Sequence, residues 1–154
     1  MPVFRWSKTA ASNGNADPTI GWAEGMVPSA VNDSARAEMA AIAMWRDDIS
    51  GSITTGGSST AYTITSNSVF ASLALMANQM IAFVPHATNG ATVTLNCDGL
   101  GAKPLRSEPS TELLAGVLVQ GTVYTATYNN SDAVWYLQNF YGNPYSVPDR
   151  KSVV

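Results

Sequence analysis

The chain has 154 residues, a formal net charge of −3 and a charged fraction of only 12%, about half the share that soluble domains usually carry. It has no basic cluster, which argues against nucleic-acid binding, and no apolar run long enough to insert in a membrane as a helix. The N-terminus also lacks the apolar core of a secretory signal. We therefore expect one small domain, or a small domain with an appendage.

Residues 1–27 are predicted to form an irregular arm. Residues 11–18 are mostly turn formers with almost no apolar content, which is typical of a loop. The large apolar side chains of the arm either cover the start of the next helix, as in a hydrophobic staple, or order only against a larger partner. We favour docking on a partner, because two tryptophans exposed on so polar a chain are unfavourable in water. The candidate docking residues are Phe4, Trp6, Trp22 and Met26.

Residues 28–51 form the one long helical pattern. Pro28 suits the first helical position, where its missing N–H would be unpaired anyway, and Gly51 can adopt the left-handed conformation that ends a helix. At 1.5 Å per residue the helix would be roughly 33 Å long. Apolar residues recur at a spacing of three and four, which marks one face: Val31, Ala35, Met39, Ile42, Trp45 and Ile49.

This helix is rich in alanine, and a single alanine-rich helix buries too little surface to be stable through packing alone. We expect several copies to associate around an axis and bury Val31, Ala35, Met39, Ile42 and Ile49. Glu38 falls on a core position of a strict heptad, and the pattern lasts only about three heptads, the lower limit for a coiled coil. The alternative is that this face packs on the chain's own β domain.

Residues 52–148 are predicted to form a small antiparallel β-sandwich-like domain, so the fold class is mainly β. Alternation marks strands at residues 60–65 and 91–96, and residues 121–140 read as a hairpin with Trp135 and Leu137 on one face. Asn89-Gly90 is a strong hairpin-turn signal. Residues 68–78 are the exception, since Val69, Leu73 and Met76 fit one face of a short helix.

No constellation for catalysis emerges, and we expect neither an enzyme nor a cofactor. Cys97 is the only cysteine and His86 the only histidine, so a disulfide within the chain is impossible and no metal-binding spacing exists. Cys97 is expected to be a small buried apolar residue. Asp47 and Asp48 could pair with Glu108 or Glu112, but adjacent carboxylates at a helix end point to different faces and are more often solvated.

A carbohydrate-binding module is the competing hypothesis. Tyr62, Trp135 and Tyr136 could stack on a sugar ring, although cross-strand packing is the commoner use of aromatic residues in a small sheet. A glycan site requires such rings to be exposed beside amide or acid groups. Burial of the three rings would count against this hypothesis.

The sequence resembles the N-terminal module of tail fibre proteins of tailed bacteriophages and prophages, especially those of α-proteobacteria. Most of the specificity lies in Glu24-Gly-Met-Val-Pro-Ser-Ala-Val-Asn-Asp-Ser-Ala-Arg36, and further likeness lies in Asp98-Gly-Leu-Gly-Ala-Lys-Pro104 and Leu118-Val-Gln-Gly-Thr-Val-Tyr124. The resemblance covers roughly residues 6–145. It implies a structural component of the virion, made in the host cytoplasm and usually trimeric.

By this resemblance residues 1–36 attach to the phage tail or baseplate, the helix is a trimer neck, and distal parts meet the host surface, with host glycan as a candidate ligand. Attachment then falls to Phe4, Trp6, Trp22 and Met26. Such fibres normally continue further, whereas residues 149–154 resemble a translated sequencing adapter. We therefore expect that last segment to be an artefact or disordered, and exclude it from the fold.

Overall fold

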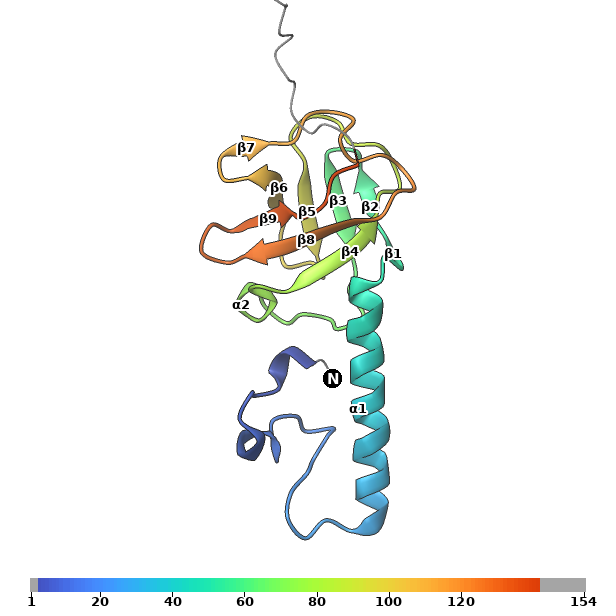
Figure 1. The fold of residues 1–154 in the computed structure, drawn as a ribbon, viewed down its shortest axis with the longest axis vertical. Coiled ribbons are helices and arrows are strands. Elements are labelled where there is room, and N and C mark those ends of the chain that lie inside the picture. Colours follow the sequence, from blue (N-terminus) through green and yellow to red (C-terminus); the bar gives the residue numbers. More distant parts are fainter. Residues whose placement is uncertain (1–2, 142–154) are drawn as a thin grey trace, which may run out of the picture.

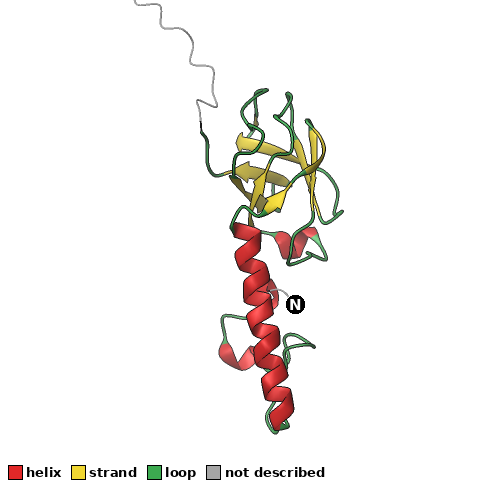
Figure 2. Ribbon diagram, turned by 90° about the vertical axis from the view of Figure 1, so that its right-hand side faces the viewer, coloured by secondary structure: helices red, strands yellow, loops and turns green. Residues whose placement is uncertain are grey.

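One long helix carries a small β domain at its C-terminal end, and the N-terminal arm lies beside the helix (Figure 1). The computed structural model describes residues 3–141. The predicted boundaries at residue 148 and the tail at residues 149–154 lie outside the described residues. Seen from the side, the helix and the sheet are stacked end to end (Figure 2). This arrangement keeps most of the helix surface away from the sheet.

Helix α1 spans Pro28–Ile49 and agrees with the predicted neck to within two residues. Pro28 occupies the first turn, as expected, and no side chain caps the N-terminus. Gly51 has a φ of +84°, the left-handed conformation that glycine adopts most easily after a helix. A Cβ at this position would also lie 2.7 Å from Cγ1 of Val123. Gly51 therefore both ends the helix and lets the β domain approach it closely.

The arm folds back along its own helix. It contains two 3-10 turns, η1 at Val3–Arg5 and η2 at Ala10–Asn13. Asn13 ties the arm together by accepting from the Ser7 amide and donating to the Ser7 carbonyl. The Ser34 hydroxyl donates to the Gly21 carbonyl at 2.8 Å. These polar contacts hold the arm against α1 in the single chain, and docking of the arm on a partner stays a prediction.

The β domain is a single mixed sheet that nearly closes on itself. The strand order is β1-β4-β8-β9-β6-β5-β3-β2, with β7 beside β6. The strands are β1 Ile53–Thr54, β2 Gly56–Ser58, β3 Ala61–Ile64, β4 Met80–Val84, β5 Thr94–Cys97, β6 Lys103–Glu108, β7 Thr111–Glu112, β8 Tyr124–Asn129 and β9 Val134–Leu137.

The prediction of a mainly β fold with one long helix is confirmed. The sheet is not purely antiparallel, however, since β1 with β4, β3 with β5 and β6 with β9 are parallel pairs. Parallel neighbours need long connections, and the chain supplies them: the segment from β3 to β5 contains the short helix α2 (Leu73–Met76) and β4. Alternation within a strand does not specify the direction of its neighbour, which explains the error.

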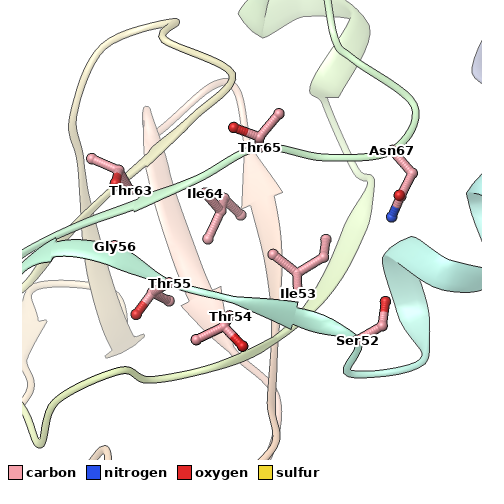
Figure 3. A pocket seen from close by; sticks show the side chains of 9 residues that line it. All are labelled: Ser52, Ile53, Thr54, Thr55, Gly56, Thr63, Ile64, Thr65 and Asn67. Atoms are coloured by element: carbon pink, nitrogen blue, oxygen red, sulfur yellow. The ribbon is translucent and has the colours of Figure 1, made fainter.

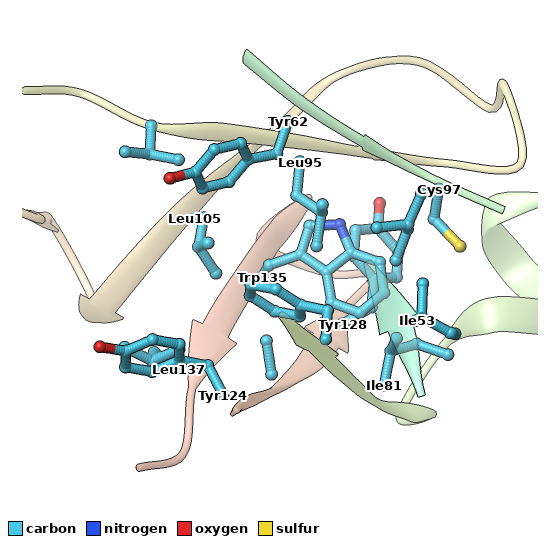
Figure 4. Close-up of a cluster of buried hydrophobic side chains, with 14 of the residues drawn as sticks. Ile53, Tyr62, Ile81, Leu95, Cys97, Leu105, Tyr124, Tyr128, Trp135 and Leu137 are labelled. Carbon is cyan, nitrogen blue, oxygen red and sulfur yellow. The ribbon is translucent and has the colours of Figure 1, made fainter. Parts of the chain in front are cut away.

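The interior of the sheet holds one apolar core (Figure 4). Strand β8 alternates as a half-buried strand should, with Tyr124, Ala126 and Tyr128 inside. The predicted hairpin is present as β8 and β9, in which Trp135 lies opposite Tyr128 with ring centroids 5.3 Å apart. Trp135 and Leu137 are both buried, as expected. The β domain therefore buries its large side chains within one copy of the chain.

Two local predictions, one turn and one short helix, need correction. Asn89-Gly90 does not form a hairpin turn; buried Asn89 instead accepts from the Leu118 amide and donates to the Leu114 carbonyl, which holds the loop before β8 over the sheet. The short helix predicted within residues 68–78 is present as α2, but Val69 is exposed with a φ of +48° and does not share its buried face.

Candidate functional site

One face of α1 is apolar and open to solvent. We call Val31, Ala35, Met39, Ile42 and Ile49 the apolar stripe. Val31 is 40% exposed, Met39 72% and Ile42 46%, whereas Ala35 and Ile49 are half-buried. Val27 and Trp45 extend the stripe at its edge and are also exposed. The predicted alternative, that the chain's own β domain covers this face, is wrong for Val31, Met39 and Ile42.

A second face of α1 is covered within the chain. Ser34, Ala41 and Asp48 recur every seven residues and are all buried. The arm reaches Ser34 through Gly21, and the start of the β domain reaches Asp48. At 3.6 residues per turn, the centre of this face lies about 100° around the helix from the centre of the apolar stripe. The arm therefore lies next to the stripe and leaves it uncovered.

The third face of α1 is polar. Asp33 and Arg36 form an exposed ion pair at 3.0 Å on this face, and Asp47 lies on the same side near the C-terminal end. The partner of Asp47 is Arg46, which lies between Ala35 and Met39 around the helix and so borders on the apolar stripe. Exposed pairs of this kind contribute little to stability. Asp33, Arg36 and Asp47 lie opposite the apolar residues, and this separation gives the helix an amphipathic pattern.

A polar junction fixes the helix to the β domain. Buried Asp48 accepts hydrogen bonds from the amide and the side chain of Asn67, at 2.6 and 3.0 Å, and from the amide of Ser68 at 3.1 Å. Sequence reasoning treated Asp48 as solvated and missed this role. A carboxylate in the last turn of a helix is unfavourable for the helix dipole, and that anomaly was the available signal for a specific partner.

Asp98 holds the same loop from the other side. It accepts from the amide and hydroxyl of Ser66 at 2.7 and 2.6 Å and from the Phe70 amide at 2.8 Å. Residues 66–70 are thus held between a carboxylate of the helix and a carboxylate of the sheet. The junction has a fixed geometry because four of the five amides of residues 66–70 donate to a carboxylate, and the fifth, that of Val69, donates to the Ser66 hydroxyl.

The four candidate docking residues differ in how exposed they are and in what they contact. Phe4 stacks on Phe70 of the β domain with ring centroids 4.6 Å apart, so its ring is engaged within the chain. Trp6 and Met26 are half-buried, whereas Trp22 is 41% exposed. Trp6 and Trp22 line one small cavity with Asp17, Ile20 and Glu38. Tail attachment stays a prediction, and the residues free to contribute to it lie around Trp22.

A polar groove opens where the sheet fails to close (Figure 3). It has a volume of about 490 Å³ and lies between the β1–β2 segment and the end of β3. Hydroxyl and amide groups dominate its lining, which carries no acidic or basic side chain: Ser52, Ile53, Thr54, Thr55, Gly56, Thr63, Ile64, Thr65 and Asn67. This lining can offer hydrogen bonds to a neutral polar ligand but no general acid or base.

The aromatic residues proposed for sugar stacking do not form a platform. Tyr62 and Trp135 are buried in the core, and the Tyr62 hydroxyl donates to the Ala87 carbonyl. Burial is the main cause that raises the pKa of Tyr62 to about 12. Tyr136 is half-buried, and its hydroxyl donates to Asp132, which raises its pKa. The rings are thus used in packing rather than presented to a ligand.

Cys97, His86 and the predicted acidic pairs also have structural partners. Cys97 is buried, as expected, and burial together with neighbouring Asp98 raises the pKa of its thiol. Nδ1 of His86 lies 2.8 Å from the Thr55 hydroxyl. Glu112 pairs with Arg106. Among residues 3–141, no group of three or more potential metal ligands is brought together, and no helix is long and apolar enough to cross a bilayer.

Comparison with models of known protein families gives no match, and neither does comparison with curated proteins. The features of the molecule that bear on function are the apolar stripe of α1, the arm, the polar junction and the polar groove.

Proposed function

We propose that the chain is the proximal section of a phage tail fibre, in which three copies associate through α1 and the arms attach to the tail or baseplate. The observation that carries this proposal is the apolar stripe, which one copy leaves open. Fully burying a side chain such as Ile42 or Met39 contributes about 1.5–3 kcal/mol, so association of several copies gains what the single chain cannot. The role in a virion comes from the sequence resemblance.

The arrangement of the two ends supports this role. The arm lies along α1, and the β domain lies at the C-terminal end of α1 (Figure 1). The polar junction joins α1 to the β domain. A connector needs attachment at one end, a continuation at the other and a fixed geometry between them. The junction at Asp48 and Asp98 supplies the fixed geometry because both carboxylates are fully used in holding one loop.

Introducing a charge on the helix tests the proposal. Ile42→Asp places a charge in the apolar stripe, whereas Ala40→Asp places the same charge on the exposed far side of the helix. We expect the full chain and Ala40→Asp to sediment at three times the 16.2 kDa of one chain, and Ile42→Asp to sediment as a single chain. Equal masses for both variants would show that the stripe is not the association surface.

The carbohydrate-binding alternative has one observation in its favour, the hydroxyl-rich groove between the β1–β2 segment and β3. Without an exposed ring, a sugar there would be held by hydrogen bonds from threonine hydroxyls and the Asn67 amide. A glycan array with the full chain checks this function. Binding that is lost in Thr63→Val but kept in Thr111→Val, outside the groove, would favour recognition of glycan. If no glycan binds, the connector role is the one remaining proposal.

A further inference from the structure

The cavity beneath the arm contains a charged atom without a partner. Asp17 is only 1% exposed. Its Oδ1 accepts from the amide and the hydroxyl of Thr19, at 2.9 and 2.8 Å, but its buried Oδ2 has no hydrogen-bond partner. Buried carboxylate oxygens are unfavourable unless they are paired. Asp17 lines a cavity of about 80 Å³, which has room for more than one water-sized group.

A second carboxylate lines the same cavity. Glu38 projects from α1 toward the arm, and neither it nor Asp17 belongs to an ion pair among the described residues. Two acidic side chains around one small space repel each other unless a cation lies between them. This placement also explains why Glu38 tolerates a core position of the heptad, since its carboxylate can turn to the arm.

The remaining walls favour an organic cation over a metal ion. Trp6 and Trp22 flank the cavity, and indole faces attract ammonium and guanidinium groups. Asn13 is occupied with Ser7 through both ends of its amide, so few oxygen ligands remain for a metal. A planar guanidinium can pair with carboxylates and stack on an aromatic ring at once, which makes arginine the best fit.

The approach to the cavity suggests that a polypeptide delivers this cation. Asn13 and Trp22 line both the cavity and an open groove of about 600 Å³ along the arm. The rest of its lining is mostly small residues, which leave room for a peptide backbone, together with Asn15 and the carboxylate of Glu24: Ala10, Ala11, Gly14 and Ala23 are the small ones. The two arginines of α1, Arg36 and Arg46, are already paired with Asp33 and Asp47.

We infer that the cavity between Asp17 and Glu38 is a socket for an arginine side chain of the protein on which the arm docks. The partner's chain lies in the groove beside Trp22, and its guanidinium enters between the two indoles and satisfies Oδ2 of Asp17. The inference rests on the proposed function only for the identity of the chain that carries the arginine.

The direct test uses the full chain and a blocked single arginine, N-acetyl-arginine methylamide, followed through the indole N–H resonances of the four tryptophans. We expect saturable shifts at Trp6 and Trp22 but not at Trp45 or Trp135, with a dissociation constant on the order of millimolar. The neutral analogue N-acetyl-citrulline methylamide should give no saturable shift. Shifts absent at Trp6 and Trp22, or equal for the two compounds, overturn the socket.

Variants locate the binding. Asp17→Asn and Glu38→Gln keep the shape of their side chains and remove one charge each, and each should weaken arginine binding about tenfold or more. Asp33→Asn, exposed elsewhere on α1, should bind as the parent chain does. Equal weakening by all three would overturn the assignment. Loss of self-association in Asp17→Asn but not in Asp33→Asn would place a second copy's basic residue in the cavity and overturn the assignment to another protein.

Binding of a single amino acid derivative does not depend on the oligomeric state or on a phage tail. A monomeric chain that binds arginine would therefore contradict the proposed trimer and support the arginine socket. A trimeric chain that does not bind arginine would support the proposed trimer and contradict the socket.

Discussion

The β domain and the helix–arm half of the molecule differ in how far they bury their apolar side chains. The sheet closes nearly on itself and hides Trp135, Tyr128 and Tyr124 in one core. The helix covers its small and polar face, with Ser34 and Ala41, and leaves Met39 and Ile42 in solvent. The comparison teaches that apolar burial is completed within one copy in the first half and is left incomplete in the second, where we propose that further copies complete it.

The largest expected effect comes from the core of the sheet. Trp135→Ala removes a fully buried ring that packs on Tyr128 and should lower the free energy of unfolding by about 3–5 kcal/mol. Chemical denaturation followed by circular dichroism measures this loss. Trp45→Ala on the exposed edge of the stripe is the matched control, and in a dissociated chain it should change stability by about 0.5 kcal/mol or less. Equal losses would break the contrast between the halves.

The next effect concerns the junction. Asp48→Ala leaves the amides of Asn67 and Ser68 without their acceptor, and each orphaned buried donor costs about 1–3 kcal/mol. Asp47→Ala removes only the exposed pair with Arg46, and should cost about 0.5 kcal/mol or less. Hydrogen exchange at residues 66–70 should rise in the first variant alone. Unchanged exchange there would mean that Asp48 does not fix the loop.

Self-association can be located by disulfide formation. Ala35→Cys lies in the apolar stripe and Ala40→Cys on the far side of the helix. On oxidation we expect rapid cross-linking of copies only through position 35. The natural thiol does not interfere, because Cys97 is buried and its pKa is raised, so little reactive thiolate forms. Cross-linking at position 40 as fast as at position 35 would contradict association through the apolar stripe.

A smaller effect is a loss of stability at alkaline pH. The thiol of Cys97 and the phenol of Tyr62 are neutral when protonated, and burial raises both pKa values, that of Tyr62 to about 12. The contribution of these two groups to the free energy of unfolding is complete below the pKa values of the unfolded chain, about 8.5 for a thiol and 10 for a phenol. It is lost as the pH rises from these values toward the higher pKa values of the folded chain. Stability should therefore fall above about pH 9, by about 1.4 kcal/mol per pH unit for one coupled proton. Urea midpoints measure this slope, which Cys97→Ala should flatten just above pH 9; a parent chain with constant stability there would contradict burial of the thiol.

The sequence was informative where a local pattern determines structure. Pro28, Gly51 and the three-and-four spacing of the stripe predicted α1 almost to its ends, and strict alternation predicted the β8–β9 hairpin. Both depend on neighbours in the chain. The exposed stripe was likewise predictable as a face, because a helix carries its periodicity with it.

Features that depend on distant residues could not be read in this way. The parallel pairing of β3 with β5 follows from how the chain returns across the sheet, which alternation does not encode. The partners of Asp48 lie about twenty residues away in a loop, and the orphaned oxygen of Asp17 becomes visible only when the arm lies on the helix. Sequence reasoning therefore missed the roles of two buried acidic groups, Asp48 with its distant partners and Asp17 with its unpartnered oxygen.

The mass of the full chain in solution tests the central claim most directly. Sedimentation equilibrium should give three times the 16.2 kDa of one chain, because we propose that association of three copies buries the apolar stripe of α1. A single-chain mass, measured together with a helix content that accounts for all of α1, would show that the neck is stable alone and would contradict the account.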